Sequence, residues 1–195
     1  MRKMIICFSI LFLAIGPIAR AQTWSLDQAH STIGFSVRHL VISKSTGQFH
    51  DYSGKVEFDG SGVENGSVDI TIQVASIDTE NEDRDKHLKS ADFFDVDKFP
   101  VMTFKSKKIT PVKDGSFSIS GDLTIKDITK EVMLGCEFNG TIDDPWGNKR
   151  AGFTAETTIN RQDFNVRFDN TLKDGSLVVG NDVKIMMEIE LIKDK

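Results

Sequence analysis

Cysteine, proline and histidine are scarce in this chain of 195 residues, which has two cysteines, four prolines and four histidines. Cys7 lies in an apolar N-terminal run, so Cys136 is the single thiol once that run is removed, and an intramolecular disulfide is excluded. Cys136 stands in an alternating strand pattern, where a lone cysteine usually serves as a small buried hydrophobe. The histidines form no closely spaced pair, and a metal centre needs three or four converging ligands. The sequence therefore predicts no metal site.

Long apolar runs are also absent, apart from residues 4–15 near the N-terminus. Arg2 and Lys3 precede this run, and Ala19-Arg20-Ala21 follows it as a small-x-small cleavage site. The run is too short to span a bilayer comfortably. We therefore predict a secretory signal peptide over residues 1–21, a single domain over residues 22–195, and a periplasmic or secreted location after cleavage.

Runs of basic residues are missing as well. The predicted signal peptide holds three of the 24 cations and none of the 29 acids, so its removal changes the formal net charge from −5 to −8. A chain this acidic is a poor partner for nucleic acid or for an anionic membrane surface, and we expect neither nucleic-acid binding nor stable membrane insertion. The oligomeric state is left open, with a homodimer as one alternative.

No motif for catalysis stands out. Ser31 follows His30 directly, but adjacent residues of a strand point to opposite faces, and the chain has no Gly-x-Ser-x-Gly elbow. Acidic residues are abundant, yet none is marked as a pair for acid–base work. The sequence therefore predicts no catalytic residue, no cofactor and no enzymatic activity.

The chain is rich in short alternating segments, which are typical of half-buried strands. Turn-forming pairs separate several of these segments, and such pairs favour hairpins. The clearest segments are "TIGFSVRH", "VDITIQV", "SFSIS", "VMLGCEF", "AGFTAETTI" and "VKIMMEIEL", and the turn pairs are Asp59-Gly60, Asn65-Gly66, Asp114-Gly115, Asn139-Gly140 and Asp174-Gly175. Together they predict an all-β protein built as an antiparallel barrel or sandwich.

Two segments depart from simple alternation. In "GQFHDYSGKVEFD" the aromatic residues Phe49 and Tyr52 are separated by an odd step, which predicts a bulge or bend between them. In "NEDRDKHLKSADFFD" the residues Arg84, His87 and Leu88 share one face of a helix, with Asn81 as its N-cap. We therefore expect one or two short helices beside the strands.

The ordered set of "LDQAHSTIGFSVRHL", "GQFHDYSGKVEFD", "ASIDTENEDRDKHLKSADFFDVDKFPVMTFKS", "GDLTIKDITKEV" and "INRQDFN" resembles the YceI-like family of exported proteins. The resemblance covers nearly all of residues 22–195. It implies a lipocalin-like antiparallel β-barrel that holds a long polyisoprenoid chain. Asp127 and Asn165 stand where the family commonly has glycine, and both residue types tolerate left-handed turn geometry.

The resemblance and the strand pattern together predict a ligand site inside the barrel. The apolar residues expected to line it are Ile33, Phe35, Val37, Phe49, Ile70, Phe93, Phe94, Phe117, Phe153 and Met187. Four polar residues are expected at a head group or at the barrel rim, namely His39, Arg84, His87 and Arg161. For Arg84 and His87 we favour structural fastening of the helix over contact with a phosphate head group.

The expected function is binding of an isoprenoid-type ligand, a polyprenyl lipid or an isoprenoid quinone, for carriage or sequestration. Two alternatives stay open. One is an enzyme that acts on such a lipid, and the other is a stress-associated structural protein with a filled core.

The signal peptide leads to a direct test. N-terminal sequencing of the protein from its native compartment should begin at Gln22, because cleavage after Ala21 removes the apolar run. Recovery of the intact Met1 end in a membrane fraction would contradict this expectation.

Overall fold

The structure, a computed structural model, describes residues 22–58 and 63–195. The predicted signal peptide (1–21) and the turn pair Asp59-Gly60 lie outside these ranges. Most of the described chain is strand, as the alternation predicts. The elements are β1 (Gln22–Leu26), β2 (Thr32–His39), β3 (Ser43–Phe49), β4 (Tyr52–Phe58), β5 (Ser67–Gln73), η1 (Val74–Ser76), β6 (Ile77–Asp78), α1 (Glu82–Lys89), β7 (Val101–Lys113), β8 (Ser116–Ile125), β9 (Ile128–Asp143), β10 (Lys149–Asn160), η2 (Arg161–Phe164) and β11 (Val179–Lys193).

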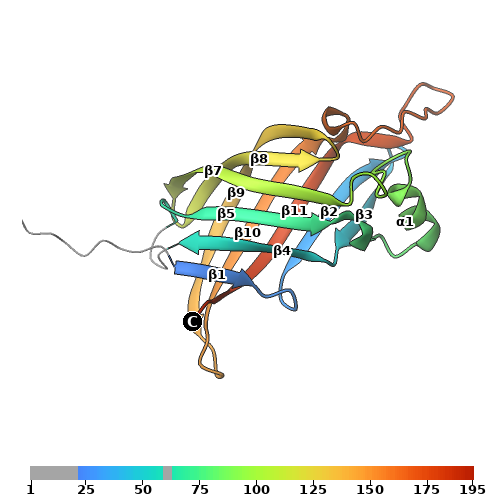
Figure 1. Cartoon of the computed structure of the whole chain (residues 1–195). Coiled ribbons are helices and arrows are strands. Elements are labelled where there is room, and N and C mark those ends of the chain that lie inside the picture. The colour runs from blue at the N-terminus through green and yellow to red at the C-terminus, as the bar shows by residue number, and fades with distance from the viewer. Residues whose placement is uncertain (1–21, 59–62) are drawn as a thin grey trace, which may run out of the picture.

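The strands form one antiparallel sheet that closes on itself (Figure 1). The order β1-β4-β5-β7-β8-β9-β10-β11 is completed by pairing of β1 with β11, which makes an eight-stranded barrel. The predicted lipocalin-like barrel with a short helix is confirmed. Among the described residues, no helix is both long enough and apolar enough to cross a bilayer.

The strands β2, β3 and β6 prolong three barrel strands rather than adding new ones. β11 pairs with β1 near its C-terminal end, where Leu191 faces Leu26, and with β2 a few residues earlier, where Glu188 faces Thr32. β3 and β4 are two parts of one interrupted strand in the same way, because they pair with β2 and β1 in turn. The chain bends at His50, between β3 and β4, which confirms the predicted bend between Phe49 and Tyr52.

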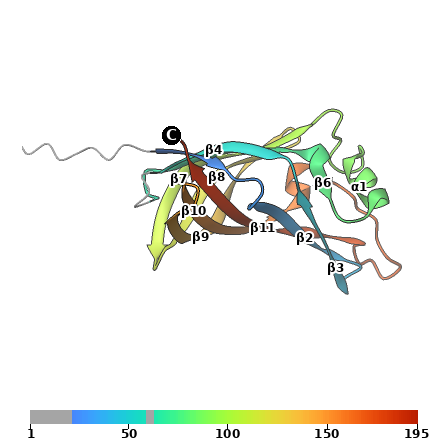
Figure 2. The ribbon, with the colours of Figure 1, turned by 90° about the horizontal axis from the view of Figure 1, so that it is seen from below.

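The two ends of the barrel differ (Figures 1 and 2). One end, which we call the α1 end, carries α1, the β2–β3 turn and the segment 165–178. The other end, the far end, carries the β7–β8 turn and the β9–β10 turn. Asn81 caps α1 as predicted, with its side-chain oxygen accepting from the backbone N–H of Arg84 at 2.9 Å.

The pair Asn139-Gly140 does not form the predicted hairpin turn. β9 continues to Asp143, and Asn139 is an extra residue between the facing pairs Gly152–Gly140 and Phe153–Phe138. Gly140 has a φ of 115°, which only glycine adopts easily, so the pair forms a bulge within the ladder. A bulge and a turn use the same residue types. Here the pairing of β9 with β10 continues on both sides of Asn139, so the pair forms a bulge and not a turn.

Residues that pair across neighbouring strands point to the same side of the sheet, so inward-pointing residues form continuous rows across the strands. One such row crosses six strands, each residue facing the next: Phe117, Cys136, Ala155, Met187, Ile33 and Phe49. The alternation therefore assigned the interior face correctly on these strands. Gly47 is required beside this row, since an added Cβ would lie 2.6 Å from the ring of Phe35.

An ion-pair network on the outside fastens the far end. Asp144 accepts from Trp146 N at 2.9 Å, Asn148 N at 2.8 Å and Arg150 Nε at 2.7 Å. Arg150 also donates to the carboxylates of Asp27 and Glu190. The network therefore joins the β9–β10 turn, β11 and the β1–β2 connection.

This network generates a pH prediction. Burial acts to raise the pKa of Asp144, but the hydrogen bonds from Arg150 and the turn outweigh it and hold the pKa well below its usual range. A lowered folded-state pKa means that the carboxylate's stabilisation is complete at neutral pH. This stabilisation declines as the pH falls below about 4, the pKa of an aspartate in the unfolded chain, and it is lost below the pKa of Asp144 in the folded protein.

We expect Asp144→Asn to lower the free energy of unfolding at pH 7 and to matter progressively less as the pH falls below about 4. Urea unfolding of both proteins at several pH values measures this. A stability difference that stays constant or grows in acid would contradict the assignment.

Candidate ligand cavity

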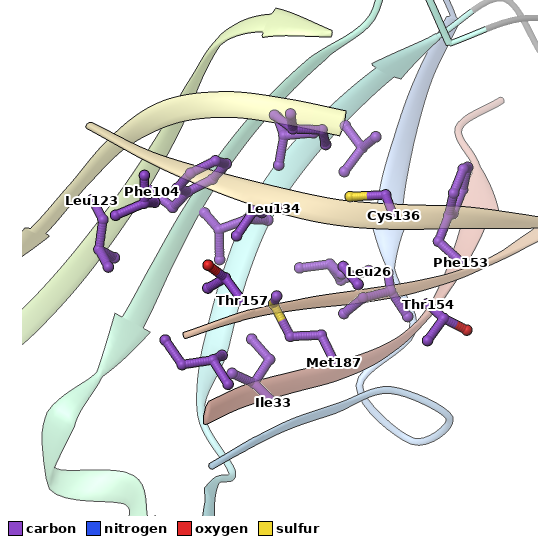
Figure 3. A pocket seen from close by; sticks show the side chains of 18 of the residues that line it. Leu26, Ile33, Phe104, Leu123, Leu134, Cys136, Phe153, Thr154, Thr157 and Met187 are labelled. Carbon is purple, nitrogen blue, oxygen red and sulfur yellow. The ribbon is translucent and has the colours of Figure 1, made fainter. Parts of the chain in front are cut away.

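An apolar cavity of about 180 Å³ lies inside the barrel (Figure 3). All eight barrel strands contribute to its wall, because their alternate residues point inward. Besides residues already predicted, the wall includes Leu26, Val56, Phe58, Met102, Phe104, Ile109, Ile119, Leu123, Ile125, Val132, Leu134, Cys136, Ala155, Thr157, Ile185, Ile189 and Leu191. The same period-two alternation marks most of these residues, so sequence reasoning could have included them.

The cavity is long and narrow. On β8 the wall runs from Phe117 to Ile125, which at roughly 3.3 Å per residue is about 26 Å of strand. A small volume spread over such a length leaves room for a slender molecule. A compact ring system of the same volume would leave much of the length empty.

Several inward side chains are only partly buried, although they face the interior. Phe35, Ile70, Ile185 and Met187 all have intermediate exposure. In a filled barrel these positions would be among the most buried in the molecule. Their partial exposure indicates that the interior is hollow at this level.

Polar groups are rare in the wall. Glu57 and Thr154 contribute to it, but their side chains point outward, and Thr154 Oγ1 meets Asn139 and Glu188 on the outer face. Thr157 has the inward phase of Phe153 and Ala155, and its side chain points into the cavity (Figure 3). Among the wall residues of the described chain, Thr157 alone presents a hydroxyl to the interior.

Seven of the ten residues predicted to line a ligand site lie on this wall: Ile33, Phe35, Phe49, Ile70, Phe117, Phe153 and Met187. Three do not. Val37 has the correct inward phase but lies farther along β2, opposite Val183 and beyond the cavity. Phe93 and Phe94 belong to the segment after α1, which the next paragraph describes. Binding of a ligand by the seven residues stays a prediction.

Phe93 and Phe94 help to plug the α1 end. Phe93 stacks on Phe168 with ring centroids 4.9 Å apart, and Phe94 meets Phe49 edge-on at 6.4 Å. Lys126, at the β8–β9 turn, donates to the carbonyl oxygens of Phe93 at 3.0 Å and of Asn165 at 3.1 Å. These contacts join the segment after α1 to the barrel, and Phe93 and Phe94 pack there instead of lying on the cavity wall.

Arg161 is a structural residue of the same end. It is buried, and its guanidinium donates to the carbonyl oxygens of Val166 at 2.8 Å, Gly180 at 2.9 Å and Phe168 at 3.1 Å, with further bonds to Val179 and Asn181. Asn165 follows η2 in the left-handed region, with a φ of 56°. The segment that follows η2 is therefore wrapped around the Arg161 side chain.

The other predicted rim residues also lie at the α1 end and outside the cavity wall. Arg84 donates to Thr79 Oγ1 at 2.7 Å and to the Thr79 carbonyl oxygen at 2.6 Å, which fastens α1 to the chain after β6. His87 pairs with Asp92 at 3.0 Å and packs its ring against Phe93 and Phe168. His39 ends β2, and its carbonyl oxygen accepts from Ser43 Oγ at 3.2 Å. The side-chain contacts of Arg84 and His87 are those expected of residues that fasten α1 to its surroundings.

One cluster of possible metal ligands and one cysteine bear on metal binding and catalysis. Asp27, His30 and Glu190 bring one ligand atom each within 4.8 Å of one another, but the Arg150 guanidinium already pairs with both carboxylates. Cys136 is buried in the cavity wall, and burial raises the pKa of its thiol to about 12. A thiol with so high a pKa stays protonated and is a poor nucleophile.

The two arginines at the α1 end should differ in their effect on stability. Arg161→Met leaves the buried carbonyl group of Val166 and several part-buried ones without a donor, at about 1–3 kcal/mol for a fully buried group, so we expect a loss of about 3 kcal/mol in the free energy of unfolding. Arg84 is exposed, and Arg84→Met should cost about 1 kcal/mol. Urea unfolding of ligand-free protein measures both values, and equal stability of the two variants would contradict the assignment.

Comparisons with known proteins agree with the barrel and with the sequence resemblance. The YceI-like domain profile matches residues 24–191. A UPF0312 protein of Ectopseudomonas mendocina is 39% identical over 157 residues, which cover 80% of this chain and 82% of that protein. Protein YceI of Escherichia coli O157:H7 is 40% identical over 162 residues, covering 83% and 84%.

Solved structures give the same result. The Campylobacter jejuni YceI protein is 35% identical with a TM-score of 0.71, covering 87% of this chain and 97% of that one. Burkholderia cenocepacia BcnA is 25% identical with a TM-score of 0.75, covering 85% and 98%. A polyisoprenoid binding domain from Saccharophagus degradans, 15% identical with a TM-score of 0.66 over 89% and 99%, shares the fold. With a closed barrel, an apolar interior and a profile match over residues 24–191, this chain belongs to the YceI-like domain family.

Proposed function

We propose that this protein is exported and holds one isoprenoid-type lipid inside its barrel, for carriage or sequestration. The observation that carries the proposal is the long, narrow cavity with an almost wholly apolar wall. Such a wall suits a linear hydrocarbon chain, because it offers contact along the whole length and nothing that would pair with a charge. A polyprenyl lipid or an isoprenoid quinone has this character. The polyisoprenoid binding domain of Saccharophagus degradans supports the proposal at the level of the fold.

The free energy of burying a long apolar chain can exceed the cost of association. Transfer of apolar groups from water contributes about 0.8 kcal/mol per CH₂. About twenty buried carbons therefore contribute roughly 16 kcal/mol. Association costs roughly 4–15 kcal/mol in lost freedom. Burial of the chain alone can thus favour the complex.

Binding of a long chain in this volume requires the wall to adjust. An engineered cavity of about 150 Å³ holds one benzene molecule, so a cavity of about 180 Å³ holds only a short segment of a lipid without adjustment. The partly buried Met187 is unbranched and flexible, and other inward residues at its level are also incompletely packed. Movement of these side chains would widen the cavity along its length.

The Thr157 hydroxyl supports a ligand with an oxygen atom. A hydroxyl that points into an apolar cavity gains from one hydrogen bond to a bound molecule. The alcohol of a polyprenol or the carbonyl of a quinone could form that bond, whereas a pure hydrocarbon could not. Thr157 therefore favours an oxygen-bearing isoprenoid over a hydrocarbon of the same length.

The alternatives receive less support. A filled-core structural protein would not leave its inward side chains partly exposed. An enzyme acting on the lipid would need reactive groups in the wall, and the wall in the described chain offers one hydroxyl and one protonated thiol. Carriage in a periplasmic or secreted location also agrees with the predicted signal peptide.

Filling the cavity from the protein side tests the proposal. Ala155 lies on the wall, so Ala155→Leu should occupy the space of the chain and lower affinity for a polyprenol at least tenfold without loss of stability. Thr158→Leu is the matched control, because Thr158 is exposed on the outer face of the same strand. Titration of delipidated protein with a polyprenol measures the affinity of each variant. Mass spectrometry of an organic extract of freshly purified protein shows whether a lipid is already bound. An empty extract together with no polyprenol binding would show the proposal to be wrong.

A further inference from the structure

The β2–β3 turn presents apolar side chains to solvent at the α1 end. Leu40, Val41 and Ile42 connect the two strands, and the pair His39–Ser43 closes the turn. Val41 is 56% exposed and Ile42 is 85% exposed. The turn lies at the tip of a ribbon that extends away from the barrel (Figure 2).

The residue types in this turn do not suit its backbone conformation. Leu40 has a φ of 50° and Val41 a φ of 65°, so two consecutive residues occupy the left-handed region. Turns of this kind strongly prefer asparagine, aspartate or glycine, and a β-branched residue with positive φ is a genuine outlier. Val41 is more than half exposed, so its side chain gains no burial that would offset the strain. An apolar residue at Val41 is therefore unfavourable for the fold itself, which suggests that a partner requires it.

Cations flank the apolar tip. Arg38 and Lys44 face each other across the two strands next to the turn, and both are exposed. Arg38 Nη1 also donates to the Val41 carbonyl oxygen at 3.5 Å, which keeps its charge beside the tip. The net charge of −5 for the whole chain is thus reversed locally. The expectation drawn from net charge, that an anionic membrane surface is a poor partner, does not apply to this turn.

The tip is held at a fixed place by its neighbour. The backbone N–H of Leu40 donates to the Val178 carbonyl oxygen at 2.9 Å, so the turn is tied to the end of the segment 165–178. Both lie at the same end of the molecule in both views (Figures 1 and 2). An apolar tip on a supported ribbon can enter an interface without refolding of the barrel.

We propose that residues 40–42 insert into the headgroup region of an anionic phospholipid bilayer, with Arg38 and Lys44 at the lipid phosphates. Apolar side chains bounded by cations are the combination that binds such interfaces, and each cation near an anionic surface adds to the attraction. A protein partner fits less well, because stable protein interfaces bury roughly 800 Å² on each side and this tip is three residues long. The proposal stands independently of the cavity's ligand.

Flotation of the purified protein with vesicles tests the proposal, and vesicles without any isoprenoid keep the test separate from the cavity. Wild type should float with vesicles of equal phosphatidylglycerol and phosphatidylcholine, and far less with phosphatidylcholine alone. Val41→Asn/Ile42→Asn should lower the affinity for the anionic vesicles at least tenfold, because two apolar side chains no longer leave water on binding. Arg38→Gln/Lys44→Gln should lower binding to the anionic vesicles only, and added salt should mimic that effect.

The control variant is Ile142→Asn, since Ile142 is 68% exposed and lies beside the β9–β10 turn of the far end. It should bind vesicles as wild type does. Thermal unfolding supplies the second measurement. Val41→Asn/Ile42→Asn should unfold at the same or a higher temperature, because asparagine tolerates the left-handed region at position 41 and Ile42 is exposed, so the loss of binding cannot be attributed to unfolding. Absence of wild-type binding to anionic vesicles, or an equal loss in Ile142→Asn, would overturn the proposal.

Discussion

The pairing of β1 with the end of β11 is the contact on which the interior depends. Without it the sheet would have two free edges, and nothing would hold its inner face as a closed surface. The seam is supported from both sides. Trp24 and Leu191 are fully buried inside it, while Arg150 joins Asp27 and Glu190 outside it. Closure is therefore stabilised by apolar packing and by charge in the same place.

Once the barrel is closed, the register decides where a void can exist. The inward row from Phe117 to Phe49 places its two small residues, Cys136 and Ala155, directly opposite each other on β9 and β10. Larger side chains surround them on β8 and β11. The wall cannot collapse onto the small residues, because the ladder hydrogen bonds fix the distance between strands. A hollow at this level is thus a result of residue size and register together.

The alternation of apolar and polar residues predicted an all-β barrel or sandwich and much of the inward face, while the choice of a barrel came from the resemblance to the YceI-like family. Ile33, Phe117 and Met187 follow a period of two, which fixes their face once a strand is assigned. Phe93 and Phe94 could not be placed in this way, since they follow a helix and their direction depends on contacts with Phe168 and Phe49, which are distant in sequence. The role of Arg161 was equally hidden, because its acceptors are carbonyl groups of a segment without regular structure.

The cavity has a measurable consequence for the balance between stability and binding. At about 24 cal/mol per Å³, an empty space of about 180 Å³ costs on the order of 4 kcal/mol. Domains of this size have net stabilities of about 5–15 kcal/mol, so such a cost is a large part of the total. The Asp144 network and the hydrogen bonds of the Arg161 guanidinium lie outside the cavity wall, where they stabilise the barrel without filling it. A molecule that fills the space restores the missing contacts and binds the folded state alone, so ligand binding and folding stability must be linked.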